Sequence, residues 1–276
     1  MSEQKIVCFD ATELDNFEMC SFRWHTFHHL NIKPKYTESY FEKGTLLHYF
    51  LERYYTQKRE KEIDIENIIE LGRIKSLEFN ITLEELSETI FQFREYCRFY
   101  EEENIVPLHI EEPFMKEIFE DEEIKVLISG KPDLIFKYNN SPSVCVMDHK
   151  RMSRNFDYSP LRNQFLLYAT AMETDTVIIN KVGFQKTKSA KDRFLRTPFI
   201  FPQEILEEWK HDIIQRAREM VVCEEYNHYQ RNRTSCEKWS GCYLQRYCIT
   251  RPAAREFLIG SEYIIGKSWD VGKKLE

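Results

Sequence analysis

The sequence predicts a mixed α/β protein, and the order of its expected elements carries this prediction. Up to about residue 104 the apolar residues recur at helical spacing, and between about residues 108 and 148 the pattern changes to short strands. A helix, two further strands and a long helix then follow. This succession is typical of a mixed α/β core.

The N-terminal part is expected to be helical. Residues Ala11–His29 form the first predicted helix, and Cys20 lies on its more apolar face. A second helix is expected over Ser39–Lys58. The acidic stretch Glu60–Asn104 carries apolar residues at helical spacing and no chemical signature, so we interpret it as a helical lobe or an insertion.

Strands and two helices are expected in the rest of the chain. A turn signal of two asparagines, a serine and a proline at 139–142 separates two of the strands and predicts a hairpin. A proline at 202 is well suited to the first turn of the last helix. The expected strands are Leu108–Phe119, Glu122–Ser129, Asp133–Tyr138, Ser143–Asp148, Thr176–Gln185 and Phe194–Phe201, and the expected helices are Leu161–Thr174 and Pro202–Tyr229.

Composition limits the class of protein. Of the 276 residues, 42% are hydrophobic and 31% are charged, which indicates a packed core. No apolar run approaches the roughly 20 residues that span a bilayer, and the start lacks the apolar segment of a secretory signal. We therefore expect a cytoplasmic protein with no membrane partner. In a reducing cytosol, clustered cysteines more often ligate metal than form disulfides.

Two carboxylates and a lysine form the first candidate site. Asp133 follows Gly130 by three residues, and Asp148-His149-Lys150 ends an apolar strand. Side chains alternate along a strand, so Asp148 and Lys150 point to one face and His149 to the other. Carboxylates suit a hard cation such as Mg²⁺, which acidifies an attacking water in phosphodiester cleavage. An Asp-x-Lys tripeptide alone is common at surface strand ends, so its context gives this pattern its weight.

Three further residues extend this site. His48 follows Gly44 by four residues in a predicted helix and could offer a neutral imidazole to the metal. Gln164 and Tyr168 are four residues apart in a later helix and therefore share a face. A lone helical histidine is more often a packing or surface residue, and a Gln/Tyr pair alone means little.

Four cysteines form the second candidate site. Cys20 lies near the N-terminus, while Cys236, Cys242 and Cys248 follow one another with five residues in each gap. Four thiolates can hold a [4Fe–4S] cluster or a tetrahedral Zn²⁺. The short Cys-x-x-Cys pairs of structural zinc sites are absent, which favours iron–sulfur. Unrelated buried cysteines are the remaining alternative.

Together, the ordered motifs Gly-x-x-x-His, Gly-x-x-Asp, Asp-x-Lys and Gln-x-x-x-Tyr resemble those of a known family. The chain is similar to the PD-(D/E)xK nucleases of the RecB type, and among them to the iron–sulfur exonucleases that include CRISPR-associated adaptation nucleases and phage relatives. The resemblance covers roughly Cys20 to Cys248. It implies a restriction-endonuclease-like core with a mixed central sheet flanked by helices, a helical lobe, and a cluster joining the N- and C-terminal segments.

The resemblance also implies roles for individual residues. His48, Asp133 and Asp148 would bind Mg²⁺ or Mn²⁺ together with the main-chain carbonyl of His149, and Lys150 would be the catalytic lysine.

Gln164 and Tyr168 match the Gln-x-x-x-Tyr motif of the family. An additional Glu often precedes the Asp in this family, and Glu111 and Glu112 are both candidates. Asp148 stands where Glu is commoner.

For the cysteines, the resemblance makes Cys20, Cys236, Cys242 and Cys248 the ligands of a [4Fe–4S] cluster. The gap between Cys236 and Cys242 is longer than the two residues common in the family, and Trp239 stands near the expected cysteine.

We therefore expect a metal-dependent DNA exonuclease that acts on single strands or DNA ends in recombination, repair, phage replication or CRISPR adaptation, where it would have a protein partner. The alternatives are a catalytically inactive DNA-binding or assembly module and an RNA-acting nuclease. The basic runs Lys181–Arg196 and Arg231–Arg255 are expected to line a DNA channel. Four segments are expected: N-terminal helices at 1–58, a helical lobe at 59–105, a nuclease core at 106–230, and the cysteine cluster and tail at 231–276.

Overall fold

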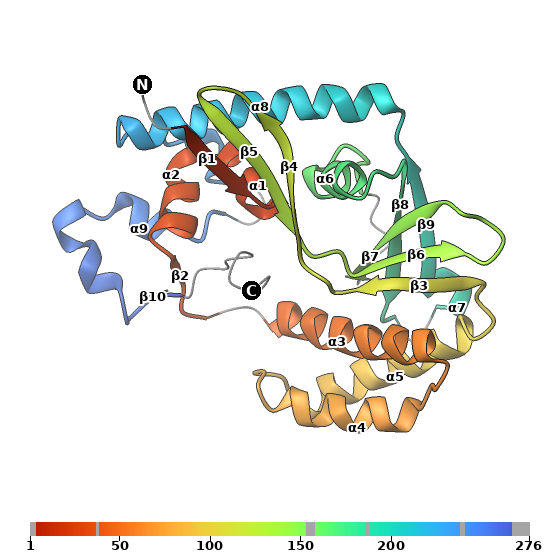
Figure 1. Cartoon of the computed structure of the whole chain (residues 1–276). Helices are drawn as coiled ribbons and strands as arrows, with labels where there is room; N and C mark the ends of the chain where they lie inside the picture. The colour runs from red at the N-terminus through yellow and green to blue at the C-terminus, as the bar shows by residue number, and fades with distance from the viewer. Residues whose placement is uncertain (1–3, 37–38, 153–157, 186–187, 238–240, 267–276) are drawn as a thin grey trace. The chain divides into compact units, whose positions relative to one another are not determined.

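The chain adopts a mixed α/β fold in a computed structural model (Figure 1). None of the described helices combines the length and the apolar character that crossing a membrane requires. The structure describes residues 4–36, 39–152, 158–185, 188–237 and 241–266.

Two compact units share the chain, and each is built from segments that are separate in sequence. The first unit consists of 1–37, 114–130 and 207–276, and the second consists of 38–113 and 131–206. The four consecutive segments expected from the sequence remain a prediction.

The second unit is organised around a five-stranded mixed sheet with the order β3-β6-β7-β8-β9. β7 and β8 pair in parallel, and the other neighbours pair antiparallel. The interior strand β8 is buried along most of its length, as expected for a strand covered on both faces. The strands are β3 (Ile105–Ile110), β6 (Leu134–Tyr138), β7 (Val144–Met152), β8 (Thr176–Gly183) and β9 (Phe194–Ile200).

Helices cover both faces of this sheet. On one face, α3 (Ser39–Glu60) and α5 (Leu83–Phe99) pack with α4 (Ile65–Ser76), and their apolar residues share one core with the sheet. Thr82 begins α5 with a capping box, since its hydroxyl accepts from the Glu85 N–H and the Glu85 carboxylate accepts from the Thr82 N–H. α6 (Asn163–Ala171) lies on the other face (Figure 1).

The first unit contains a three-stranded sheet and several helices. The sheet has the order β1-β5-β4, and the short strands β2 and β10 pair separately. The long helix α8 belongs mostly to this unit, although its first four residues are assigned to the second unit. The short helix α7 (Ala190–Arg193) belongs to the second unit. The remaining elements are β1 (Lys5–Phe9), α1 (Ala11–Met19), α2 (Ser21–Trp24), a π-helix (His25–His29), β2 (Ile32–Pro34), β4 (Phe114–Glu120), β5 (Ile124–Gly130), α8 (Gln203–Glu225), α9 (Gln245–Ile249) and β10 (Tyr263–Ile265), with 3₁₀ turns at Arg233–Ser235 and Pro252–Leu258.

Two expected elements are divided in the structure. The strand predicted over Leu108–Phe119 breaks between β3 and β4, where Glu111 takes a left-handed φ of 51° and Pro113 cannot donate to a ladder. The single helix predicted over Ala11–His29 is interrupted at Cys20, whose φ of −172° is extended. Both interruptions fall at residues that belong to the candidate sites.

Candidate active site

The β6–β7 hairpin brings the two predicted aspartates together. Leu134 pairs with Met147, so Asp133, one residue before, and Asp148, one residue after, are opposite each other at the end of the ladder. This register confirms the hairpin that the turn signal predicts. Both carboxylates are buried, with 10% of the Asp133 side chain and 2% of the Asp148 side chain exposed.

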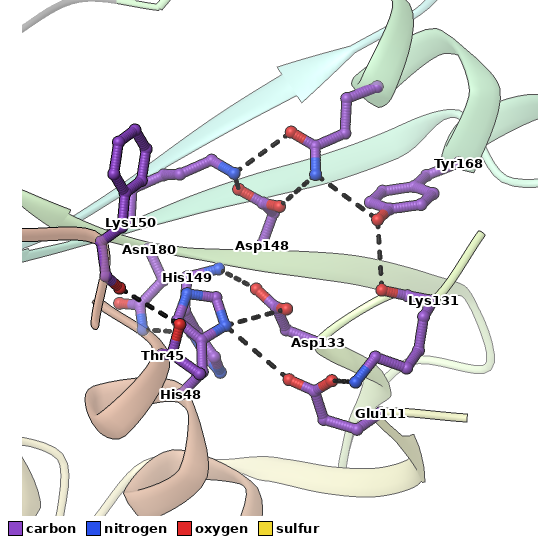
Figure 2. Close-up of polar contacts among 12 residues, drawn as sticks. Thr45, His48, Glu111, Lys131, Asp133, Asp148, His149, Lys150, Tyr168 and Asn180 are labelled. Carbon is purple, nitrogen blue, oxygen red and sulfur yellow. Dashed lines mark hydrogen bonds and ion pairs between the residues drawn. The ribbon is translucent and has the colours of Figure 1, made fainter. Parts of the chain in front are cut away.

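His48, Glu111 and Asp133 form a compact group of possible metal ligands (Figure 2). His48 Nδ1, supplied by α3, lies 3.1 Å from Asp133 Oδ1 and 3.7 Å from Glu111 Oε1. One nitrogen or oxygen atom from each residue lies within 4.8 Å of the others. Because the backbone is left-handed at Glu111, immediately after the end of β3, the Glu111 side chain points toward His48 and Asp133.

The structure places the two candidate glutamates in different surroundings. Glu112 lies 2.6 Å from His109 and 3.6 Å from Arg59, and about half of its side chain is exposed. Only Glu111 of the pair lies in the group with His48. Neighbouring residues in an irregular segment differ in direction, which the sequence pattern could not specify.

Asp148, Lys150 and Gln164 form a second, adjoining cluster. Lys150 Nζ lies 2.7 Å from Asp148 Oδ2 and donates to Gln164 Oε1 at 3.1 Å. The Gln164 amide donates to Asp148 Oδ1 at 2.9 Å, and it lies 3.4 Å from the Tyr168 hydroxyl. Gln164 therefore fixes the lysine and the carboxylate relative to each other. Gln164 and Tyr168 can both reach this cluster because residues four apart share one face of α6.

Lys131 is a site residue that sequence reasoning missed. Its ammonium forms an ion pair with Glu111, and its main-chain carbonyl accepts a hydrogen bond from the Tyr168 hydroxyl at 3.2 Å. The only signal was its position inside the Gly-x-x-Asp motif.

His149 faces away from the carboxylates, as strand alternation predicts. Its main-chain N–H donates to Asp133 Oδ2 at 2.6 Å. Its ring is buried on the helical face, where it stacks on Tyr55 and contacts Asn180. The backbone of His149 thus contacts the candidate site, whereas its side chain lies in the core beneath the helices.

The electrostatics of the site follow from burial and close pairing. Although burial opposes protonation of His48, the charge and hydrogen bond of Asp133, together with Glu111, raise its pKa to about 10. Burial would raise the pKa of Asp133, but the His48 charge outweighs it and holds this pKa below its usual value. Burial lowers the pKa of His149 to about 3, so this imidazole is neutral.

The Asp148–Lys150 pair behaves differently. Burial raises the pKa of Asp148 above its usual value, even though Lys150 opposes this shift. Burial likewise opposes the charge on Lys150, but Asp148 and Asp133 raise the pKa of the ammonium. Each member of the pair therefore favours the charged form of the other against the effect of burial.

The donor set suits a hard divalent cation. Carboxylate oxygens are the ligands that Mg²⁺ and Mn²⁺ prefer, and Asp148 adds a third carboxylate opposite Asp133. The lysine next to these oxygens is a fixed positive charge in a buried environment. Such an arrangement can stabilise the negative charge that develops on a phosphate during hydrolysis.

The four predicted cluster cysteines line one cavity of about 390 Å³ in the first unit. Cys20 lies between α1 and α2, and Cys248 lies in α9. Arg231 Nε lies 3.2 Å from Cys248 Sγ. Among the described residues, no three of the sulfurs approach within 4.8 Å of one another. Trp239 lies outside the described residues.

The basic run Lys181–Arg196 is only partly available to a ligand. Lys181 and Arg193 are buried, with 4% and 7% exposed. Arg196 forms an ion pair with the buried Glu103. These three cations therefore offer little charge to a ligand, and the DNA channel expected along the run remains a prediction for its other basic residues.

A family model described as the PD-(D/E)XK nuclease superfamily matches residues 9–249. A solved structure titled "Crystal structure of SSO0001" is 12% identical with a TM-score of 0.36, and the match covers 80% of this chain and 78% of that chain. With so low a TM-score, that likeness supports no further conclusion. No curated protein matches.

Proposed function

Because this chain belongs to the PD-(D/E)XK nuclease superfamily, we propose that it is a metal-dependent exonuclease acting on single-stranded DNA or DNA ends. The observation that carries this proposal is the convergence of His48, Glu111 and Asp133 beside the Asp148–Lys150 pair. Membership of the superfamily supports a metal-dependent nuclease. The choice of DNA and of ends rests on the motif resemblance to RecB-type exonucleases.

In the proposed site, His48, Glu111, Asp133 and Asp148 would hold Mg²⁺ or Mn²⁺ together with the main-chain carbonyl of His149. The bound ion would neutralise the phosphate and acidify the attacking water.

Lys150 orients this water and stabilises the negative charge of the transition state. Gln164 holds the side chains of Lys150 and Asp148 in a fixed relative position through its two hydrogen bonds. Tyr168 holds the Lys131 carbonyl and so fixes the segment that leads to Asp133.

We test this proposal by digestion of end-labelled single-stranded DNA in Mn²⁺, in Mg²⁺ and in EDTA, with RNA of the same sequence alongside. Lys150→Ala should abolish metal-dependent shortening. Lys137→Ala, a lysine on β6 of the same hairpin, is the matched control and should cleave like wild type. Full cleavage by Lys150→Ala would refute the mechanism.

The same assay separates the alternatives. DNA binding without cleavage in either metal would favour an assembly module, and preferential digestion of RNA would favour an RNA-acting nuclease. Labels at the 5′ and 3′ ends report the polarity, for which 5′ ends are expected from the resemblance. A role in recombination, repair, phage replication or CRISPR adaptation in the cytoplasm, with a protein partner, follows as a proposal from the same resemblance.

The four cysteines are proposed to hold a [4Fe–4S] cluster with a structural role. In tetrahedral zinc sites, Zn–S bonds of about 2.3 Å keep the sulfurs roughly 3.8 Å apart. All four cysteines line one cavity, and no three of their sulfurs are mutually within 4.8 Å in the described part of the chain, which supports a group larger than a single zinc ion. Iron and sulfide analysis of anaerobically purified protein tests this proposal, and zinc in place of iron would contradict it.

A further inference from the structure

A row of polar side chains crosses the buried face of the five-stranded sheet, opposite the face that carries Asp148 and Lys150. His149 on β7 is in register with Asn180 on β8, and Asn180 is in register with Arg196 on β9. Asn180 is fully buried and only 2% of His149 is exposed. The amide Nδ2 of Asn180 lies 2.8 Å from His149 Nδ1.

Two tyrosines from the helices close this row into a network. The Asn180 amide donates to the Tyr96 hydroxyl of α5 at 2.8 Å, and the hydroxyls of Tyr55 and Tyr96 lie 2.5 Å apart. Arg196 donates to both hydroxyls, at 3.1 and 3.2 Å, and forms an ion pair with Glu103. Both tyrosines are fully buried.

The network reaches the proposed metal site through one residue. The Tyr55 ring stacks on the His149 ring with centroids 5.6 Å apart and planes 10° apart, while Asn180 holds the ring edge. The N–H of the same residue donates to Asp133 Oδ2 at 2.6 Å. A shift of the His149 side chain would therefore move the backbone that supports Asp133.

Stability alone does not account for these residues. Buried polar groups cost stability when they lack a partner, as Asn180 Oδ1 and His149 Nε2 do among the described residues, and well-packed apolar side chains of similar volume are often as stable or more stable. Phe93 and other apolar residues already fill the neighbouring core. Residues that orient metal ligands, in contrast, typically change metal affinity about 10–100-fold when replaced.

We propose that Asn180, Tyr96 and Tyr55 are positioning residues that hold His149 so that its backbone supports the metal site. This inference rests on the proposed function, because it takes the group around Asp133 as a site for Mg²⁺ or Mn²⁺. It also gives the helical segment a role, since Tyr96 comes from α5.

The test measures Mn²⁺ affinity by titration calorimetry on the DNA-free full chain, with thermal unfolding of each variant. Tyr96→Phe and Asn180→Leu should each weaken Mn²⁺ binding about tenfold or more. The double variant should lose less than the product of the two single effects, because both residues act through one network. Tyr54→Phe is the matched control, since Tyr54 is buried on the same helix as Tyr55 and packs on the rings of Tyr55 and Tyr96, while its hydroxyl makes none of the hydrogen bonds described above.

Each outcome bears on the proposal. Wild-type Mn²⁺ affinity in a folded Tyr96→Phe variant would overturn the inference while leaving the proposed function intact. If Asn180→Leu fails to fold, the Mn²⁺ affinity of Tyr96→Phe alone tests the inference, because this substitution removes a single oxygen atom. A wild-type chain that binds no Mn²⁺ would overturn the proposed function and this inference together.

Discussion

Replacing Lys150 with methionine should destabilise the fold, because it removes the cation that faces the buried Asp148 carboxylate. Lys150 Nζ lies 2.7 Å from Asp148 Oδ2, and only 2% of the Asp148 side chain is exposed. Removing one partner of a buried ion pair destabilises by about 3–5 kcal/mol while the other stays ionised. Because 23% of the Lys150 side chain is exposed, we expect the lower end, about 3 kcal/mol. This corresponds to a fall in the melting temperature of about 6–12 °C.

The loss of stability should depend on pH in a defined direction. Burial raises the pKa of Asp148 and Lys150 opposes this shift, so Lys150→Met raises this pKa further. A carboxyl whose pKa is raised on folding binds more protons in the folded than in the unfolded state, so its contribution to stability grows as pH falls. The deficit of the variant relative to wild type is therefore largest near pH 8 and shrinks toward pH 5.

Thermal unfolding in EDTA between pH 5 and pH 8 measures this deficit, with Lys137→Met as the control from the same hairpin. Cleavage of single-stranded DNA in Mn²⁺ at pH 8 should fall about 10²–10³-fold in Lys150→Met, the range for removing one transition-state donor. A deficit of equal size at every pH would refute the reasoning, because it would show that Asp148 does not carry the effect.

Three further substitutions test other parts of the structure. Glu111→Gln should weaken Mn²⁺ binding by at least about tenfold in calorimetry, whereas Glu112→Gln should match wild type; equal effects would contradict the assignment of Glu111. Gly72→Ala should destabilise by about 1–3 kcal/mol in urea unfolding, because an added Cβ would lie 1.9 Å from the Phe50 ring; unchanged stability would show that the ring can move aside. Cys242→Ser should remove the broad absorbance band expected near roughly 400 nm for an iron–sulfur cluster, and a band that persists would exclude this ligand.

The hairpin at the centre of the site could be predicted because its signals are local. The turn residues at 139–142 join two apolar strands, and strand alternation sets which side chains share a face. Asp133 and Asp148 therefore had to lie opposite each other once the hairpin formed. The apposition of Asp148 and Lys150 follows from the same two-residue period.

Other parts of the site depend on tertiary contacts that no local pattern encodes. Glu111 joins the site because the chain leaves β3 in a left-handed conformation, which is uncommon for a residue other than glycine. Asn180 contacts His149, which is 31 residues away in the sequence, and it donates to Tyr96, which is 84 residues away. In the sequence, Tyr96 and Asn180 have the spacing of ordinary core positions, so their hydrogen bonds were not foreseeable.

The interleaving of the two units limits how this protein can be divided experimentally. The chain passes from one unit to the other near residues 37, 113, 130 and 206. His48 and Glu111 precede the second passage, whereas Asp133 and Lys150 follow the third, so the metal-binding group needs both segments of its unit. The four cysteines likewise come from the first and last segments of the other unit. A deletion of residues 59–105, the segment interpreted from sequence as a separate lobe, would remove Tyr96 from the core that supports β7. We therefore expect point substitutions, and not truncations, to separate the roles of the two sites.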